Sequence, residues 1–290
     1  MSSTFEMMQK KIASGEDLSS IVRTMKALAA TSVRQYEKAA ESLDDYYQTV
    51  EMGLSVVLLS HSEPLVSPSA DASKPALMVI IGSDHGLAGR FNEQIVSYAL
   101  RKLPSNRIVA CIGEQAVTRV KAAGINVAQS FTLPTSISAI TSFVQLLLTR
   151  IEKWQREEGV EQVVLFYNRP QPGGFYPNAE NMLPVSLSAL YKKKVAWKSR
   201  SLPTFTIPAG ELLSALLRQY FFVSLYRACA LSLTAENTSR LAAMQAAEKN
   251  INERLDKLKT AFQHERQAVI TAELLDIISG FKAVRSKTAE

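Results

Sequence analysis

The residues that could do chemistry gather in one glycine-rich turn, Ser83-Asp84-His85-Gly86-Leu87-Ala88-Gly89. The turn follows an apolar run that ends at Ile81, and doubly wound α/β folds bind ligands at the carboxyl ends of their strands. It lacks both the full G-x-G-x-x-G fingerprint and the Lys-Ser/Thr pair of a phosphate loop. His85 beside Asp84 suggests acid–base chemistry, but no serine or cysteine nucleophile has a matching context. A structural turn is the simpler interpretation, and a nucleotide site is the alternative.

The other residues that could take part in catalysis or metal binding are scattered along the chain. His61 and His264 stand apart without metal-ligand spacing, and Cys111 and Cys229 form neither a disulfide framework nor a metal-binding cluster. We therefore expect no catalytic residue, no metal site and no cofactor, and we expect both thiols to be buried.

The segment that holds the turn alternates between two kinds of hydrophobic pattern. The pattern predicts strands at 76–81, 107–112, 125–131 and 160–167, and helices at 91–103, 114–123 and 135–158. This alternation is typical of a mostly parallel sheet with helices on its faces. Residues 169–178 are predicted to be a proline- and glycine-rich loop. The basic run Lys192-Lys193-Lys194 is interpreted as a solvated loop, with a polar partner surface as the alternative.

Proline and glycine are distributed unevenly. All eleven prolines lie between Pro64 and Pro208, and residues 16–52 and 211–279 contain neither proline nor glycine. A continuous helix over the second run would be roughly 100 Å long, whereas a compact protein of this length is roughly 50 Å across. We expect an N-terminal coiled-coil helix at 1–60, an α/β domain at 61–209 and a C-terminal coiled-coil helix at 210–290.

Apolar and small residues recur about every 3.5 positions in both arms, which is the coiled-coil repeat. The first predicted seam is Leu18, Ile21, Met25, Leu28, Ser32, Tyr36, Ala39, Leu43, Tyr46, Val50, Leu54 and Val57. The second is Leu241, Met244, Ala247, Ile251, Leu255, Leu258 and Phe262, continuing through Ile270, Leu274, Ile277 and Phe281. Two arrangements fit, a dimerisation coiled coil and an intramolecular antiparallel pair. Gly15 is expected to break the first helix early.

The net charge of +6 comes mainly from the middle segment, where residues 61–209 carry 16 basic and 10 acidic side chains. The segment shows no nucleic-acid recognition motif, and attraction to an acidic partner or an anionic membrane surface is equally allowed. The longest aliphatic run, 77–81, is too short to span a bilayer, and the N-terminus lacks the apolar core of a signal peptide. We expect a soluble protein on the cytoplasmic side.

Four motifs resemble the gamma subunit of F-type ATP synthases, in the family's order and over nearly the whole chain. Residues 266–276, RQAVITAELLD, with Gly280-Phe281-Lys282-Ala283, are similar to the signature I-T-x-E-x-x-D/E followed by G-A. Glu236 and Arg240–Ala247 resemble S-E-x-x-x-R-M-x-A-M. The turn at 83–92 resembles S-D-R-G-L-C-G-G-F-N, and residues 21–30 resemble the helix-one motif.

The resemblance implies an α/β fold in which the two terminal helices form an antiparallel coiled coil with an inserted Rossmann-like α/β domain. It implies the central stalk of a rotary F1Fo ATPase, which couples ion translocation to ATP synthesis or hydrolysis. Catalysis in the family occurs on beta, so the chain itself is expected to be non-catalytic. The implied partners are an alpha3beta3 ring, the epsilon subunit and the c-subunit ring, with no nucleic acid. The implied location is peripheral, at the cytoplasmic face of a bacterial plasma membrane.

The same resemblance implies two sets of functional residues. The expected rotor contacts with beta are Met25, Lys26, Arg266, Gln267, Thr271 and Glu273. The expected turn of the α/β foot domain is formed by Ser83, Asp84, Gly86, Gly89 and Asn92. Departures from the family motifs at His85, Ala88, Arg90 and Phe281 indicate a divergent branch, an alternate ATPase. The main alternative is a nucleotide-binding α/β enzyme with helical dimerisation arms, and a third is a nucleic-acid binder.

Overall fold

The computed structural model describes residues 2–60, 73–185 and 203–287, with side chains described over 5–58, 73–185 and 203–279. Contacts divide the chain into two units, Met1–Leu28 with Ala242–Glu290, and Ala29–Leu241. In chain order the elements are α1 (Ser2–Ser60), β1 (Ala76–Ile81), α2 (Phe91–Leu100), β2 (Arg107–Ile112), α3 (Glu114–Ala122), β3 (Gln129–Phe131), α4 (Ile137–Glu157), β4 (Gln162–Gln171), β5 (Gly174–Leu183) and α6 (Ala209–Lys287).

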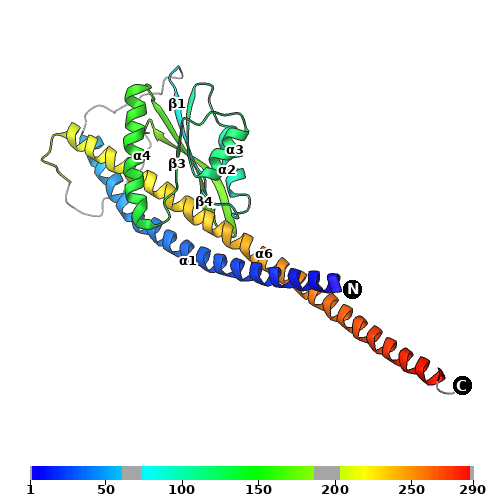
Figure 1. The fold of residues 1–290 in the computed structure, drawn as a ribbon. Helices are drawn as coiled ribbons and strands as arrows, with labels where there is room; N and C mark the ends of the chain where they lie inside the picture. The colour runs from blue at the N-terminus through cyan, green and yellow to red at the C-terminus, as the bar shows by residue number, and fades with distance from the viewer. Residues whose placement is uncertain (1, 61–72, 186–202, 288–290) are drawn as a thin grey trace. The chain divides into compact units, whose positions relative to one another are not determined.

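The unit Ala29–Leu241, called here the α/β unit, is built on a five-stranded sheet (Figure 1). The strand order is β3-β2-β1-β4-β5. β1 pairs in parallel with β2 and β4, β2 pairs in parallel with β3, and β5 is antiparallel to β4. This order reproduces the 3-2-1-4 arrangement of a Rossmann-like sheet. The expected mixed α/β fold with a mostly parallel sheet is confirmed.

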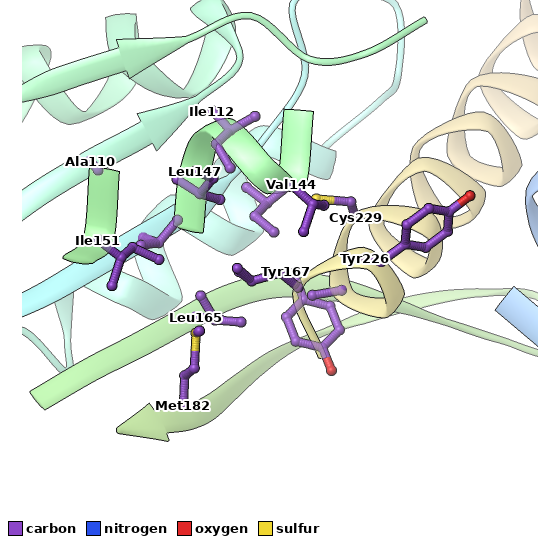
Figure 2. Packing of buried hydrophobic residues seen from close by; sticks show 14 of the residues in the cluster. Ala110, Ile112, Val144, Leu147, Ile151, Leu165, Tyr167, Met182, Tyr226 and Cys229 are labelled. Atoms are coloured by element: carbon purple, nitrogen blue, oxygen red, sulfur yellow. The ribbon is translucent and has the colours of Figure 1, made fainter. Parts of the chain in front are cut away.

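Helices cover both faces of this sheet, which explains why its central strands are continuously apolar. On β1, Leu77 and Val79 join the core under α4 and α6, while Met78 and Ile80 join the core under α2 and α3. Figure 2 shows the first of these cores, in which Leu147 from α4 and Cys229 from α6 pack with strand residues. α4 begins where the Ser136 hydroxyl accepts the Ala139 N–H.

The predicted loop at 169–178 is wrong, because these residues lie in the β4–β5 hairpin. Gln171 pairs with Gly174, and the chain reverses through Pro172-Gly173 with φ +78° at Gly173. Pro170 lies beyond Phe166, the last β4 residue that pairs with β1, so its missing N–H costs no hydrogen bond on that side. Pro177 lies on β5, the edge strand of the sheet, where proline is also tolerated.

The parts of α1 and α6 inside the α/β unit run antiparallel within one chain. The Tyr46 hydroxyl donates to Gln219 Oε1 at 3.0 Å, and Arg227 Nε lies 3.2 Å from Asp44 Oδ1. A third contact places Gly53 beside Leu216. From Asp44 to Gly53 the residue numbers rise along α1, while those of the partners on α6 fall from Arg227 to Leu216, so the two helices run antiparallel.

The unit Met1–Leu28 with Ala242–Glu290, called here the helix pair, is also antiparallel and intramolecular. The rings of Phe5 and Phe262 stack with centroids 4.5 Å apart, and the Ser19 hydroxyl lies 3.4 Å from Asn252 Oδ1. The expected break at Gly15 is wrong, since α1 continues through it. A Cβ at Gly15 would lie 2.7 Å from Leu255 Cδ2, so this glycine permits close helix approach.

The predicted seam of α1 is displaced by one residue inside the helix pair. Leu18, Ile21 and Leu28 are 49%, 54% and 64% exposed, whereas Ser19 and Val22 are buried. Two neighbouring faces of α1 share the spacing of about 3.5 residues, one with Leu18 and Ile21 and the other with Gly15, Ser19 and Val22. The close approach at Gly15 places the second face, which has the smaller side chains, against α6. No described helix has a stretch that is long and apolar enough to cross a membrane.

Candidate functional sites in the turn and on the helix pair

The turn after β1 is anchored by two hydrogen bonds between the buried residues Ser83 and Asn92. The Ser83 N–H donates to Asn92 Oδ1 at 2.9 Å, and Asn92 Nδ2 donates to Ser83 Oγ at 2.8 Å. Gly82 permits this arrangement, since a Cβ there would lie 2.5 Å from the Cβ of Ala116 and 2.7 Å from Asn92 Oδ1. These bonds fix the start of α2 against the end of β1. Ser83 and Asn92, both expected turn residues, lie together here.

Asp84 bonds to the N-terminus of α3 and to the chain after β3. Its carboxylate accepts the Glu114 N–H, the first of α3, at 3.1 Å and the Leu133 N–H at 2.7 Å. A negative charge at a helix N-terminus is stabilising, and the same backbone groups bind phosphate in nucleotide sites. Because each oxygen of Asp84 accepts a backbone N–H, the carboxylate joins three segments of the unit, which is a structural role.

The crevice at the switch point of the sheet, between β1 and β4, is filled by the chain itself. Ala88, Phe91 and Ala235 pack together there as a small buried cluster. Asn168 Nδ2 donates to the Phe91 carbonyl at 3.1 Å, and the Ser239 hydroxyl donates to the Ala88 carbonyl at 2.6 Å. A nucleotide at the usual position would displace these groups. The nucleotide-enzyme alternative is therefore not favoured.

The tip of the turn is exposed. Gly89 adopts φ +57° and Leu87 adopts φ +63°, although Leu87 carries a side chain that is 61% exposed. A Cβ at Gly86 would meet no atom within 4 Å, so close packing does not require glycine there. Arg90, a departure from the family motif, pairs with Glu93 at 2.7 Å on the surface.

Behind the turn, Glu236 of α6 is buried and pairs with Arg240, whose guanidinium lies 2.5 Å from Glu236 Oε1. Burial raises the pKa of Glu236, and the positive charge of Arg240 opposes that rise. Both residues belong to the motif that resembles S-E-x-x-x-R, and the structure gives that motif a structural role at the base of the turn.

Two of the expected rotor contacts lie on α1 in the helix pair. Met25 is half-buried, and Lys26 Nζ lies 2.5 Å from Glu248 Oε2. Arg23 Nε lies 3.1 Å from Glu248 Oε1, so one carboxylate holds two cations. The hydrogen bond from Lys26 lowers the pKa of Glu248, and Arg23 lowers it further. Sequence reasoning missed Glu248, for which the only signal was the pair of cations three residues apart on the facing helix.

The other four expected contacts are exposed on α6. Thr271 donates its hydroxyl to the Gln267 carbonyl at 2.8 Å, one turn back along the helix. Arg266 and Glu273 line a cavity of about 390 Å³ together with Phe5. Their spacing of seven residues therefore does place them on one face, as expected.

The two groups of expected contacts do not form one site. Phe5 faces Phe262 and Lys26 faces Glu248, which places the α1 and α6 groups at different levels of the antiparallel pair. The 18 residues from Glu248 to Arg266 correspond to about 27 Å of helix.

Between and beyond these polar residues α6 exposes a row of large apolar side chains. They are 46% to 58% exposed and comprise Ile270, Leu274, Leu275, Ile277 and Ile278. Three of these positions were expected to continue the buried seam, and that expectation is wrong. The stacking of Phe5 on Phe262 brings the start of α1 to that level, and Ala272 is the last described α6 residue that is partly covered. Phe281 lies outside the residues with described side chains. The row is called here the apolar end of α6.

No group of three or more His, Cys, Asp or Glu side chains that could hold a metal occurs among the described residues. Cys111 and Cys229 are free and buried in separate cores, and burial raises the pKa of each thiol to about 12. A thiol with so high a pKa is a poor nucleophile at neutral pH. His61 and the basic run at 192–194 lie outside the described residues.

A family model described as ATP synthase matches residues 4–284, nearly the whole chain. The chain belongs to the ATP synthase gamma family. It is 27% identical over 292 residues to the ATP synthase gamma chain of Sulfurihydrogenibium sp. (strain YO3AOP1), covering 96% of this chain and 97% of that one. It is 25% identical over 284 residues to the gamma chain of Clostridium botulinum (strain Kyoto / Type A2), with the same coverage.

Solved structures share the fold of this gamma-family chain at lower identity. The rotor of the Euglena gracilis mitochondrial ATP synthase in rotational state 1 aligns with a TM-score of 0.66 at 15% identity, covering 93% of this chain and 100% of that one. A chain of the OSCP/F1/c-ring assembly from the same organism in rotational state 3 aligns with a TM-score of 0.69 at 16% identity, covering 99% and 97%. The resemblance stated from the sequence motifs is confirmed.

Proposed function

We propose that this chain is the central-stalk, or rotor, subunit of a rotary F1Fo ATP synthase. In this role it couples ion translocation through a membrane ring of c subunits to ATP synthesis or hydrolysis on beta. The observation that carries the proposal is the apolar end of α6 on a chain of the gamma family. Large exposed apolar patches on a soluble chain mark contact surfaces.

The chemistry of the apolar end suits a part that turns inside a ring. Apolar contact is not directional, so a surface of Leu274, Ile277 and similar side chains keeps comparable contact at each angle of rotation. Directional hydrogen bonds and ion pairs, by contrast, would favour one angle. The contacts with beta expected from the family are few, and all but Met25 are polar; they are Met25 and Lys26 on α1 and Arg266, Gln267, Thr271 and Glu273 on α6. Polar contacts at few points hold the shaft at particular angles without preventing its rotation.

The proposed chain is non-catalytic, and catalysis belongs to beta. Its own turn supports this assignment, because Asp84 holds two backbone donors and the switch-point crevice is filled. We also propose that the chain has three functional parts, the helices 1–60 and 210–290 and the α/β segment 61–209 between them. The segment 61–209 acts as a foot whose excess positive charge faces the c ring and the epsilon subunit, at the cytoplasmic face of a bacterial membrane, where the chain is a peripheral protein.

Reconstitution with alpha and beta subunits from the same source tests this proposal. The double variant Leu274→Asp/Ile277→Asp places two charges on exposed positions, so the isolated chain keeps its fold. Burying each uncompensated charge in an apolar contact costs at least 1–3 kcal/mol, so assembly should weaken about tenfold or more. Size-exclusion chromatography and ATP hydrolysis of the purified complex are the readouts.

The matched control is Asn250→Asp/Gln263→Asp, which adds the same charge to exposed α6 positions outside the apolar end. This control should assemble like the unaltered chain. Failure of the unaltered chain to assemble with alpha and beta would overturn the proposal. If both double variants assembled equally well, the apolar end of α6 would not be the surface that contacts the ring.

A further inference from the structure

A cavity of about 140 Å³ lies in the α/β unit, beside the turn after β1. Its walls come from four segments, namely α1, the turn, the loop between β3 and α4, and α6. Most of its lining residues carry polar side chains, among them Ser32 and Tyr36 of α1 and Glu236 of α6. A polar cavity of this size has room for several water molecules, each of which takes up about 30 Å³ in the liquid.

One oxygen of the cavity wall lacks a hydrogen-bond partner among the described residues. Glu236 is 5% exposed, and its Oε1 lies 2.5 Å from the Arg240 guanidinium, whereas its Oε2 is buried without a partner. Leaving a buried acceptor unpaired costs free energy, and more when the acceptor is charged. Buried polar atoms of folded proteins are normally satisfied by another protein group or by an ordered water.

The side chains that line the cavity do not satisfy this oxygen directly. The hydroxyls of Ser32, Tyr36 and Thr135 belong to the wall, but within the described part of the chain none of them is hydrogen-bonded to Oε2. The same holds for the imidazole of His85. The Tyr36 hydroxyl donates instead to the Thr135 carbonyl at 3.0 Å, which leaves the Tyr36 oxygen able to accept.

The remaining polar groups of the wall hold one another in place. Arg240 donates to Glu236 Oε1 at 2.5 Å and to Asn237 Oδ1 at 3.2 Å. Asn237 Nδ2 donates to the Leu233 carbonyl at 2.8 Å, and each oxygen of Asp84 accepts a backbone N–H. Each of these side chains would have to break a bond that it already makes in order to turn towards Oε2. A small molecule inside the cavity meets no such cost.

The protonation chemistry of Glu236 restricts the class of that molecule. Burial raises the pKa of Glu236, and the positive charge of Arg240 opposes the rise. As a carboxylate, Oε2 requires a hydrogen-bond donor, whereas as a protonated oxygen it requires an acceptor. An ammonium ion can only donate and a metal ion can only take lone pairs, so each of them suits the carboxylate alone. Water donates and accepts, and it therefore suits both states.

We propose that the cavity is an internal hydration site, in which an ordered water molecule is hydrogen-bonded to Glu236 Oε2. A buried water needs about two to four polar partners. Oε2 supplies one, and the hydroxyls of Ser32, Tyr36 and Thr135 are of the kind that supplies the others. The water then connects α6 to neighbouring segments of the α/β unit by hydrogen bonds that the side chains do not make directly. The site belongs to the chain itself and does not depend on the proposed function.

Magnetic relaxation dispersion of ¹⁷O in solutions of the full chain tests the proposal, because it detects only waters held much longer than those of the surface. Glu236→Met and Glu236→Gln both remove the charge and leave Arg240 without its carboxylate, but only glutamine can still hydrogen-bond to water. Glu236→Met should therefore lose the dispersion amplitude of at least a single water, and Glu236→Gln should keep it. The same amplitude in Glu236→Met as in the unaltered chain would overturn the proposal, as would the same loss in both variants.

Nuclear Overhauser effects between water and methyl groups of the unaltered chain decide the question if Glu236→Met does not fold. Leu133 and Leu233 line the cavity and are 6% and 4% exposed, so their methyl groups should show cross-peaks with water. Leu165 is fully buried in the same apolar cluster without lining the cavity, and its methyl groups should show none. If Leu133 and Leu233 gave no more signal than Leu165, the cavity would not hold an ordered water.

Discussion

The α/β unit and the helix pair are held together by different means. The sheet of the α/β unit is covered on both faces, and strand side chains such as Leu77 and Leu165 are fully buried. In the helix pair the buried residues of α1 are small, Ser19 and Val22, next to a glycine that touches Leu255. Burial of many large side chains therefore stabilises the first unit, whereas close approach of the helices around a few buried side chains, Met244 and Leu255 among them, stabilises the second. We expect the α/β unit to respond most to lost volume and the helix pair to respond most to added volume.

The largest expected effect is the loss of volume in the α/β unit. Leu165→Ala removes a fully buried side chain from the core shown in Figure 2 and should destabilise the unit by about 2–5 kcal/mol, since a rigid core closes only partly around a cavity. The midpoint of urea unfolding measures it. Leu146→Ala makes the same change at a side chain that is 58% exposed and should shift stability by less than about 0.5 kcal/mol. Equal costs would show that the core is not closely packed.

The second effect is added volume in the helix pair. Gly15→Val forces branched carbon atoms against Leu255 and should open the pair locally, at a cost of about 1–3 kcal/mol. Faster amide exchange in residues 5–28 is the measurement. Ala13→Val adds a β-branched side chain at an exposed position and should leave exchange nearly unchanged. If Gly15→Val exchanges no faster than Ala13→Val, the close approach does not hold the pair.

The smallest effect concerns the charges of the helix pair. Glu248→Gln removes the partner of both Arg23 and Lys26 and should give a small loss of stability that fades at high salt. The pKa of Glu248 is lowered, so its stabilisation is present above the ordinary carboxyl range and is lost as the pH falls through the lowered value. Thermal unfolding at low and high salt is the readout. Glu253→Gln, whose partner Lys249 lies 4.0 Å away on the same helix, should have less effect. A reversed order would argue that the pairing of Glu248 with Arg23 and Lys26 does not stabilise the helix pair.

The same contrast explains how much the sequence could predict. The strands 76–81 and 107–112 were predicted with their observed bounds, because burial on both faces gives continuous apolar runs. The hairpin was missed, since Pro170 and Pro177 are local turn signals whose tolerance depends on lying at the edge of a sheet. The predicted seam of α1 differs from the observed one by one residue because two neighbouring faces of the helix have the same period. The contact between Gly15 and Leu255, which selects the face that is buried, forms only in the folded chain.

Among the candidate sites, some features could be predicted from the sequence and others could not. Arg266 and Glu273 lie on one exposed face of α6, as their seven-residue spacing predicts. The role of Asp84 could not be predicted, because its partners at Glu114 and Leu133 are backbone groups brought together only by the folded sheet. Glu248 was missed for a similar reason, since its cations lie more than 200 residues away in the chain.

Rotation of the assembled chain tests the central claim most directly. Ser105→Cys places a thiol on an exposed loop of the α/β unit, while Cys111 and Cys229 stay buried, so one marker particle can be attached selectively. With alpha and beta subunits fixed to a surface and ATP supplied, the marker should turn in one direction and pause three times in each revolution. ATP hydrolysis by the same complexes with a stationary or randomly turning marker would contradict the account.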